Sequence, residues 1–304
     1  MGAGRWGFWF LGTLLLLRTS ISPGTFIASA VSNGQIRITG DNSTSPVPIH
    51  IYHRGSANLA LVPQVVFDAP NGTNAVAAGL RLGNASVSGN GNAVLDLSEG
   101  RTNLDQIKDS IHIIGDGFNS GNRRAYFRLN GGSETIGGIT DLGNGVIIEN
   151  YAPDGSRAAP ATLTINGSGD SFIGGVLRNT AVTTAGNSID DNPNNRDGAD
   201  EFNQGDSSGS ASPFALSLTK AGSSTLTLSG SRIYYTGGTT ISGGTLLLNG
   251  TTNFRSDIVN NSALVINQNS GTWNFRREFA DPDLGGPLTA PSPENLKITG
   301  TGSL

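Results

Sequence analysis

Short runs that alternate apolar and polar residues recur along this chain, and each run predicts a β-strand. Alternation with a period of two is typical of a half-buried strand, because successive side chains point to opposite faces. The run Val65–Phe67 is more uniformly apolar than the runs around it and predicts a strand buried on both faces. The other predicted strands are Ile36–Thr39, Ile49–Tyr52, Leu80–Leu82, Ala93–Leu97, Val146–Ile148, Leu163–Ile165, Phe172–Leu177, Leu226–Leu228, Leu246–Leu248, Leu264–Ile266 and Leu296–Thr299.

The clearest cadence lies in Ser217–Gly250, where the runs at Leu226–Leu228 and Leu246–Leu248 stand 20 residues apart. A fixed spacing of this size between strands is typical of a solenoid, in which one coil stacks on the next. Glycine pairs six residues apart separate the strands, at 131–132 and 137–138 and again at 237–238 and 243–244. Several strands end in Asn-Gly, as at Asn130-Gly131, Asn166-Gly167 and Asn249-Gly250. Both residue types tolerate the left-handed conformation that turns a corner.

This pattern predicts an all-β fold, a parallel β-helix with Leu, Ile and Val inside and Ser, Thr and Asn outside. Residues 99–110 are the only plausible helix, of one or two turns, and a surface loop is the equal alternative. Residues 186–213 are acidic and polar, and residues 281–293 are rich in proline. Both segments predict protruding loops, and any binding is expected to come from them.

The two ends of the chain carry separate expectations. Residues 1–30 resemble a secretory signal, with Arg5 before the apolar run Phe8–Leu17 and a small-x-small cleavage site at Ala28–Ala30. That run is too short to span a bilayer as a helix, and a buried strand is the alternative. At the other end Ser303-Leu304 repeats the pair Ser217-Leu218. We therefore expect the sequence to be truncated there, or its end to be capped by another molecule.

Composition narrows the classes of function. Charged residues make up 14% of the 304 residues, and 44 are glycine, so the surface is expected to be polar without being charged. A net charge of −4 and a pI near 5.3 provide no basic footprint for nucleic acid. The absence of cysteine excludes disulfides and thiolate metal sites.

The segment LTKAGSSTLTLSG followed by YTGGTTISGGTLLLNG, within 217–250, closely resembles the autotransporter-associated β-strand repeat, also called the passenger-associated transport repeat. Here Ser224 stands where the family usually has glycine, and Arg232-Ile233-Tyr234 replaces the usual Ala-Asn-Thr. The segment LNGGSETIGGIT from Leu129 resembles a sister element often found upstream in the same proteins.

This resemblance implies a right-handed parallel β-helix, secreted or exposed on the extracellular face of a bacterial outer membrane. It brings no catalytic residues, and residues 250–304 do not resemble the C-terminal membrane barrel of an autotransporter. The missing translocator indicates either a lost C-terminal part or a repeat used without self-transport. The domain organisation expected is a signal peptide at 1–30 and a β-helix passenger-like domain at 31–304.

Candidate chemistry was sought among the acidic and histidine side chains. A polysaccharide hydrolase on a β-helix needs two carboxylates held about 5–9.5 Å apart. The richest acidic clusters, Asp190-Asp191 and Asp197 with Asp200-Glu201, lie in the 186–213 loop, so we expect solvated acids there. His50 and His53 are the only close histidine pair, and their odd spacing on a strand places them on opposite faces.

Other candidate sites are equally weak. The segment 193–204 fails the EF-hand pattern, because its first position is Pro193 and its last is Gln204. Trp273 and Phe275 share one strand face, and Tyr234-Tyr235 places one ring inside and one outside. Core packing is expected for these aromatic residues, with carbohydrate stacking as the alternative.

These observations favour a non-enzymatic, exported β-solenoid that serves as a cell-surface or secreted scaffold or adhesin-like module. No catalytic, cofactor or metal site is predicted. The expected partners are surface glycans or other cell-surface proteins, with no nucleic acid and no transmembrane segment in the mature chain. The alternative is a carbohydrate-active β-helix enzyme, a hydrolase or lyase, whose carboxylates have no recognisable motif.

Overall fold

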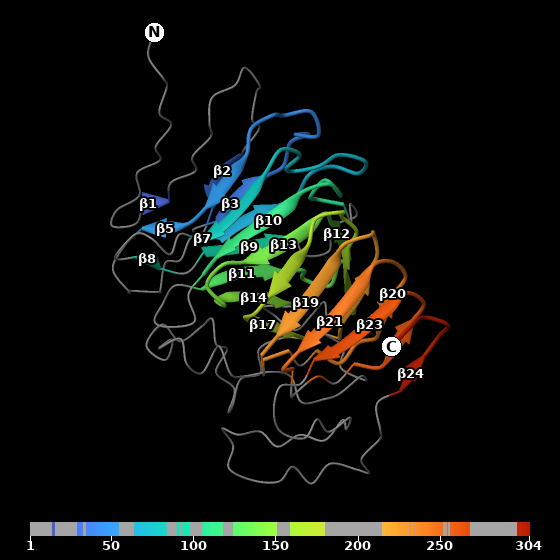
Figure 1. The fold of residues 1–304 in the computed structure, drawn as a ribbon. Helices are drawn as coiled ribbons and strands as arrows, with labels where there is room; N and C mark the ends of the chain where they lie inside the picture. The colour runs from blue at the N-terminus through green and yellow to red at the C-terminus, as the bar shows by residue number, and fades with distance from the viewer. Residues whose placement is uncertain are drawn as a thin grey trace.

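The computed structural model describes residues 14–15, 29–32, 35–54, 64–83, 90–91, 93–97, 105–117, 124–150, 159–179, 215–230, 232–233, 235–251, 254, 256–267 and 297–304. These residues form strands, turns and bends and include no helix. Most strands stack in three parallel sheets (Figure 1). The predicted all-β fold, a parallel β-helix, is therefore confirmed.

The eight-stranded sheet runs the length of the stack and is parallel throughout. Its strands are β4 (Ile49–Ile51), β7 (Leu80–Gly83), β10 (His112–Asp116), β13 (Gly138–Asp141), β16 (Ser171–Ile173), β19 (Thr225–Ser229), β21 (Thr245–Asn249) and β23 (Ala263–Asn267).

The seven-stranded sheet forms a second side of the stack. It contains β2 (Ser29–Ser32), β3 (Gln35–Ile38), β6 (Gln64–Phe67), β9 (Ala93–Leu97), β11 (Ala125–Arg128), β14 (Val146–Glu149) and β17 (Val176–Arg178). Its pairs are parallel except β2 with β3, which is antiparallel. The edge strand at this end of the sheet is therefore β2, which runs antiparallel to the others.

The six-stranded sheet completes the coil. It contains β12 (Glu134–Ile136), β15 (Ala161–Ile165), β18 (Leu216–Lys220), β20 (Thr239–Ile241), β22 (Ile258–Asn260) and β24 (Ile298–Thr299). A small antiparallel sheet of β1 (Leu14–Leu15), β5 (His53–Arg54) and β8 (Asn90–Gly91) lies beside the first coils (Figure 1).

Each coil visits the sheets in a fixed order, as β12, β13 and β14 do, and then β15, β16 and β17. The coils shorten towards the C-terminus: Leu226 pairs with Leu246, which pairs with Leu264. In these short coils the seven-stranded sheet is reduced to the bridge between Leu177 and Ile233. The cadence of 20 and 18 residues found in the sequence is therefore the length of one such coil.

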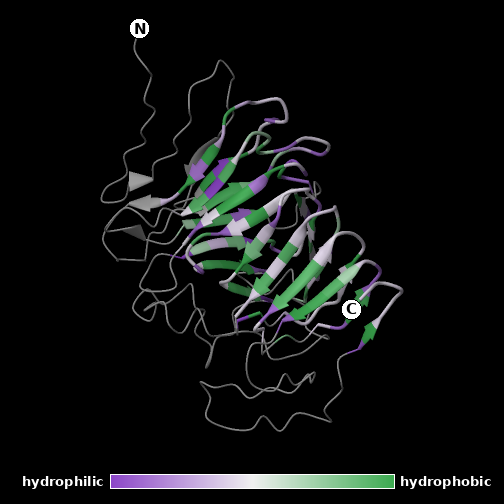
Figure 2. Ribbon diagram, viewed as in Figure 1, coloured by the Kyte–Doolittle hydropathy of each residue, from purple (hydrophilic) through white to green (hydrophobic). Residues whose placement is uncertain are grey.

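Apolar side chains from the three sheets fill one continuous core, and the corners between strands are mostly polar (Figure 2). The aromatic rings of Phe67 and Phe127 are fully buried there. Full burial of a large apolar side chain contributes about 1.5–3 kcal/mol. The prediction that Val65–Phe67 is buried on both faces is confirmed, because all three side chains are buried.

Two polar side chains replace strand pairing where the six-stranded sheet begins. The carboxylate of Glu134 accepts the backbone N–H groups of Gln106, at 3.1 Å, and Ile107, at 2.9 Å. One coil earlier the Gln106 side chain makes two hydrogen bonds to the backbone of Ala69, at 2.7 and 3.2 Å. Buried backbone groups that lack a strand partner are thus satisfied.

The predicted helix at 99–110 is not seen in its described part, residues 105–110, which hold a bridge at Ile107 and a turn. Of the predicted signal segment, Leu14–Leu15 and Ser29–Ala30 are described, as β1 and part of β2, so the signal stays a prediction. The loops at 186–213 and 281–293, with their acidic clusters, lie outside the described residues, as do Trp273 and Phe275. Within the described part of the chain no helix is long and apolar enough to cross a membrane.

Candidate functional site

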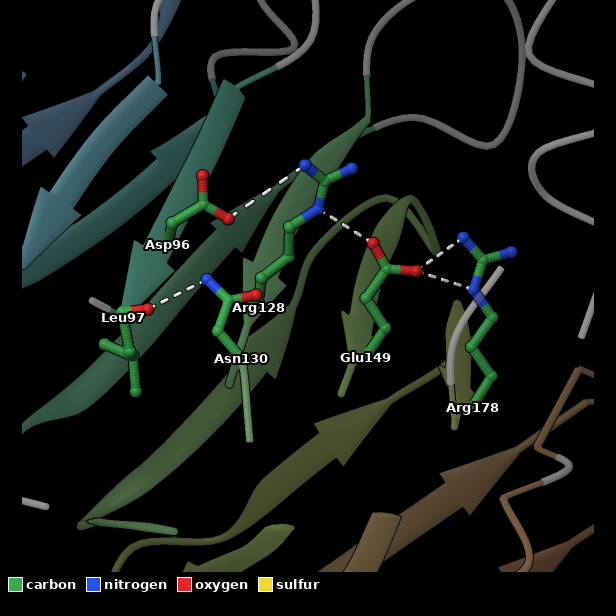
Figure 3. A network of polar contacts seen from close by, with 6 residues as sticks. All are labelled: Asp96, Leu97, Arg128, Asn130, Glu149 and Arg178. Atoms are coloured by element: carbon green, nitrogen blue, oxygen red, sulfur yellow. Dashed lines mark hydrogen bonds and ion pairs between the residues drawn. The ribbon is translucent and has the colours of Figure 1, made fainter. Parts of the chain in front are cut away.

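The most concentrated polar chemistry among the described residues is a ladder of four charged side chains on the outer face of the seven-stranded sheet. We call it the charge ladder: Asp96, Arg128, Glu149 and Arg178. Consecutive strands β9, β11, β14 and β17 pair these residues directly, so acid and base alternate (Figure 3). Residues at these positions point away from the core because their neighbours Leu95, Phe127 and Ile148 point into it.

Short contacts join the members of the charge ladder. The Nε atom of Arg128 lies 2.8 Å from Oε1 of Glu149, and Nε of Arg178 lies 2.8 Å from Oε2 of the same carboxylate. A second nitrogen of Arg178, Nη2, lies 2.6 Å from Oε2, and the contact from Arg128 to Asp96 is longer, at 4.0 Å. Glu149 therefore receives hydrogen bonds from two guanidinium groups at once.

The charge ladder is buried although it faces outwards. Glu149 is 0% exposed, Arg178 1% and Arg128 4%. An apolar stripe of Val94, Tyr126, Ile147 and Val176 runs beside it on the same face and is also buried. The guanidinium of Arg128 lies 4.9 Å from the centre of the Tyr126 ring, at a distance typical of a cation–π contact. Loss of one partner of an ion pair with this burial is strongly destabilising, because the remaining charge stays out of water.

Asparagine side chains tie the corner that follows the seven-stranded sheet. Asn150 Oδ1 accepts the N–H of Gly131 at 2.7 Å, and Asn179 Oδ1 accepts the N–H groups of Leu216 and Thr236, both at 3.0 Å. At the neighbouring corner Asn130 has a φ of 50°, the left-handed conformation predicted for it from the Asn-Gly pattern. Asparagine side chains thus stabilise turns between coils, and Asn150 and Asn179 were not among the strand-end asparagines named from the sequence.

The repeat segment from Ser217 to Gly250 forms the two most regular coils. Lys220 stands at an inward position of β18, paired with Ile165 on one side and Ile241 on the other. Its Nζ donates to the carbonyl oxygen atoms of Ala221, Gly222 (3.2 Å) and Gly243 (3.3 Å). Burial lowers the pKa of Lys220, and the charge of Asp170 partly opposes that change. Lys220 therefore caps the glycine corner between two coils.

Replacing Lys220 with methionine is expected to lower the free energy of unfolding by about 2 kcal/mol. The loss leaves the three carbonyls without this donor, at a cost of about 1–3 kcal/mol for an unsatisfied buried group. The apolar methionine side chain, lying between Ile165 and Ile241, offsets part of that cost. Urea denaturation measures the change. Lys108→Met, at an exposed lysine, is the matched control and should change stability by less than about 0.5 kcal/mol. Equal stability of the two variants would show that the ammonium caps nothing.

The departure from the family pattern at Ser224 has a structural explanation. Its hydroxyl donates to the carbonyl oxygen of Gly167 on the preceding coil, at 3.0 Å, and its own carbonyl accepts the N–H of Thr245 on the next coil. Serine thus adds a bond between coils at a corner where glycine would add none.

Two histidines, His50 and His112, make contacts that join neighbouring strands. His50 contacts the carbonyl oxygen of Gly83 at 2.7 Å, and its ring lies 4.6 Å from that of Tyr52. His112 contacts Thr140 Oγ1 at 2.8 Å, and burial lowers the pKa of its imidazole. The side chain of His53 lies outside the described residues, so a site shared with His50 stays untested. Among the described residues, no group of three or more potential metal ligands is found.

Tyr235 is the inward ring of the Tyr234-Tyr235 pair and is fully buried. It lies edge-to-face against Phe254, with ring centres 5.7 Å apart, and its hydroxyl shares a 2.6 Å hydrogen bond with Thr239 Oγ1. Burial raises the pKa of Tyr235. Core packing, the expectation for this ring, is confirmed, while the side chain of Tyr234 is outside the described part of the chain.

The sequence analysis missed the charge ladder. The one signal for it is that each member follows an apolar residue at the end of a strand, with the sign of the charge alternating from strand to strand. Coil lengths vary in this half of the chain, and the four residues are therefore unevenly spaced in the sequence. Only the pairing of the strands brings them into line.

Comparison with known proteins places one segment in a family. Residues 218–248 match the family model described as the passenger-associated-transport-repeat, about a tenth of the chain. No curated protein and no solved structure matched the chain. The matched residues run from Leu218 in β18 through β19 and β20 to Leu248 in β21, so they cover the capped glycine corner. The chain is thus a parallel β-helix that carries, at residues 218–248, a repeat associated with the passenger domains of autotransporters.

Proposed function

We propose that this protein is an exported, non-enzymatic β-helical passenger module that serves as a scaffold or adhesin-like element on the cell surface or in the secreted fraction. The observation that carries the proposal is the passenger-associated transport repeat at residues 218–248, which is built into a continuous stack of coils. A repeat that extends a stack adds length and lateral surface rather than a catalytic cavity.

The contacts of three buried acids, Asp96, Glu149 and Glu134, support a structural role. General acid–base hydrolysis needs one carboxyl group that holds a proton and one that is free to act as a base or nucleophile. Asp96 and Glu149 lie on one face, two strands apart, but Arg128 stands between them and bonds to Glu149. Glu134 is bonded to two backbone N–H groups. In these positions the carboxylates stabilise the fold.

Two measurements on the full chain test the proposal. The chain is expressed in a bacterium with an outer membrane, and the periplasmic, surface and released fractions are analysed by mass spectrometry. We expect protein outside the cytoplasm, processed near residue 30, and retention in the cytoplasm of a variant lacking residues 2–17. An unprocessed wild-type chain confined to the cytoplasm would contradict export.

The second measurement separates scaffold from enzyme. Purified protein is incubated with a panel of acidic and neutral polysaccharides, and both reducing ends and unsaturated uronide products are followed. We expect neither to form, while the same protein binds intact glycans or cell surfaces in a pull-down. Product formation above that of a heat-denatured sample would establish the carbohydrate-active alternative in place of the scaffold.

A further inference from the structure

Asp141 is an acidic side chain that lies inside the core. The inward column of the eight-stranded sheet passes from Ile51 to Leu82, Gly115 and Asp141 on successive strands. Ile51 and Leu82 are fully buried apolar residues, and Asp141 itself is 3% exposed. An aspartate thus occupies a place that the alternation of the strand gives to an apolar side chain. Its strand neighbour Gly115 has no side chain, and the Val146 side chain fills the space there.

The carboxyl group of Asp141 is only partly satisfied. Its Oδ1 atom accepts the N–H of Gly145 at 3.2 Å, which ties the turn between β13 and β14 to the end of β13. Its Oδ2 atom is buried and makes no hydrogen bond of ordinary geometry. The backbone N–H groups of Gly143, Val146 and Gly174 are nevertheless close enough to act on the carboxyl group. The surroundings leave this atom little space, because a Cβ placed on Gly175 would come within 2.9 Å of it and within 2.1 Å of the Val146 carbonyl oxygen.

The residues packed around this carboxyl group provide no compensating charge. They come from β10 (Gly115), from the turn after Asp141 (Gly143, Gly145 and Val146) and from the Gly174-Gly175 pair. The strands that pack around Asp141 do carry charged residues, but these side chains face outwards. Asp116, next to Gly115, bonds to Arg81 on the outer face of the eight-stranded sheet, and Glu149 of β14 belongs to the charge ladder.

Water lies one short turn away from this buried acid. Leu142, the next residue, is 58% exposed, and Asn144 is exposed with a left-handed φ of 55°. The turn at 142–145 therefore separates the carboxyl group from solvent by a few residues. Opening of this turn would hydrate an ionised carboxylate without unfolding the rest of the stack.

We propose that Asp141 and the turn at 142–145 form a pH-sensitive latch, closed when the carboxyl group is protonated and loosened when it is ionised. A neutral acid is compatible with the apolar column, because it carries no charge that burial would deprive of water. An ionised carboxylate there is a buried charge without a counter-ion, so the open and hydrated turn gains population. The latch adds a conformational control to the middle of the helix, independent of the proposed scaffold role.

The direction in which burial shifts the pKa of Asp141 agrees with this geometry. Burial raises the pKa of its carboxyl group above the ordinary value of 3.8, and the backbone N–H groups of Gly145, Val146, Gly143 and Gly174 oppose part of that rise. Between 3.8 and the raised pKa, the folded chain holds a proton that the unfolded chain has lost. Stability from this group is therefore lost as the pH rises through that interval.

The latch is tested first in the wild-type protein, by following the amide resonance of Gly145 against pH. Its N–H bonds directly to Asp141, so its chemical shift reports the ionisation of this acid. We expect a midpoint above 3.8 and, above that midpoint, faster hydrogen exchange of the amides at residues 143–146 after correction for intrinsic base catalysis. A midpoint at or below 3.8, or exchange that stays constant through the midpoint, would overturn the proposal.

The Asp141→Asn variant provides the second arm. The unfolding equilibrium constant of this variant is expected to lack the pH dependence that Asp141 gives to the wild type. The ratio of the wild-type to the variant constant should therefore rise with pH, by about tenfold in total for each unit by which folding raises the pKa of Asp141. Asp41→Asn is the matched control, since this exposed aspartate has a pKa lowered by hydrogen bonds from Ser43 and should shift the ratio in the opposite direction. If the unfolding constants of the wild type and of Asp141→Asn change with pH in parallel, the latch is refuted. If the variant does not fold, the titration of the Gly145 amide in the wild type decides alone.

Discussion

Replacing Glu149 with glutamine is expected to lower the free energy of unfolding by about 3–5 kcal/mol, the largest effect of any substitution considered. The side chain is fully buried between Arg128 and Arg178, with oxygen–nitrogen distances of 2.6–2.8 Å. Glutamine keeps the shape but removes the negative charge that both guanidinium groups contact, while Asp96 stays 4.0 Å from the nearer of them. Loss of one partner of a buried ion pair costs this amount because the remaining charge is uncompensated. Chemical denaturation of both proteins measures it.

Two further variants show whether the charge is the cause. Asp68→Asn breaks the ion pair with Arg37, whose members are 35% and 41% exposed, and should cost less than about 1 kcal/mol. The double variant Glu149→Leu with Arg178→Met removes one charge of each sign and leaves Arg128 with Asp96. We expect it to recover at least half of the stability lost in Glu149→Gln. A double variant as unstable as the single one would assign the loss to packing instead of charge.

The strands could be predicted from the sequence because they depend on local alternation. Leu226–Leu228 and Leu246–Leu248 lie in β19 and β21, with Thr227 and Leu247 turned away from the core, and the regular spacing identified the coil. The Asn-Gly corners were also local signals, and Asn130, Gly131 and Gly250 all have positive φ. Each of these features is decided within a few residues of the chain.

The polar residues inside the core were wrongly predicted. The alternation places Leu, Ile and Val inside and Ser, Thr and Asn outside, yet Glu134, Asp141 and Lys220 occupy inward positions. Each is explained by a backbone group on another coil or turn: Gln106 for Glu134, Gly145 for Asp141 and Gly243 for Lys220. Such partners depend on how the coils stack, which local periodicity does not specify.

The glycines show the same division between local and long-range causes. Gly131 and Gly250 adopt positive φ, which explains them as corner residues. Gly167 does not have a positive φ, and the preceding coil explains why glycine is needed there. A Cβ at this position would lie 1.8 Å from the carbonyl oxygen of Gly137. The same close contact recurs on the next coil, since a Cβ on Gly222 would lie 2.4 Å from the carbonyl oxygen of Gly167. Backbones of successive coils therefore touch at this corner, and only hydrogen fits between them.

Replacing Gly167 with alanine is accordingly expected to lower the free energy of unfolding by about 3 kcal/mol, at the upper end of the usual cost of overpacking. The atoms that would have to move are backbone atoms of Gly137, whose N–H is bonded to the carbonyl oxygen of Ile111, so relief of the clash disturbs a third coil. Thermal and urea denaturation measure the loss.

Gly238→Ala is the matched control from the repeat itself, because a Cβ there meets nothing within 4 Å and the residue is exposed with no positive φ. It should leave stability unchanged or raise it by less than about 1 kcal/mol. If the two variants change the free energy of unfolding by the same amount, the close contact between coils does not exclude a Cβ at Gly167.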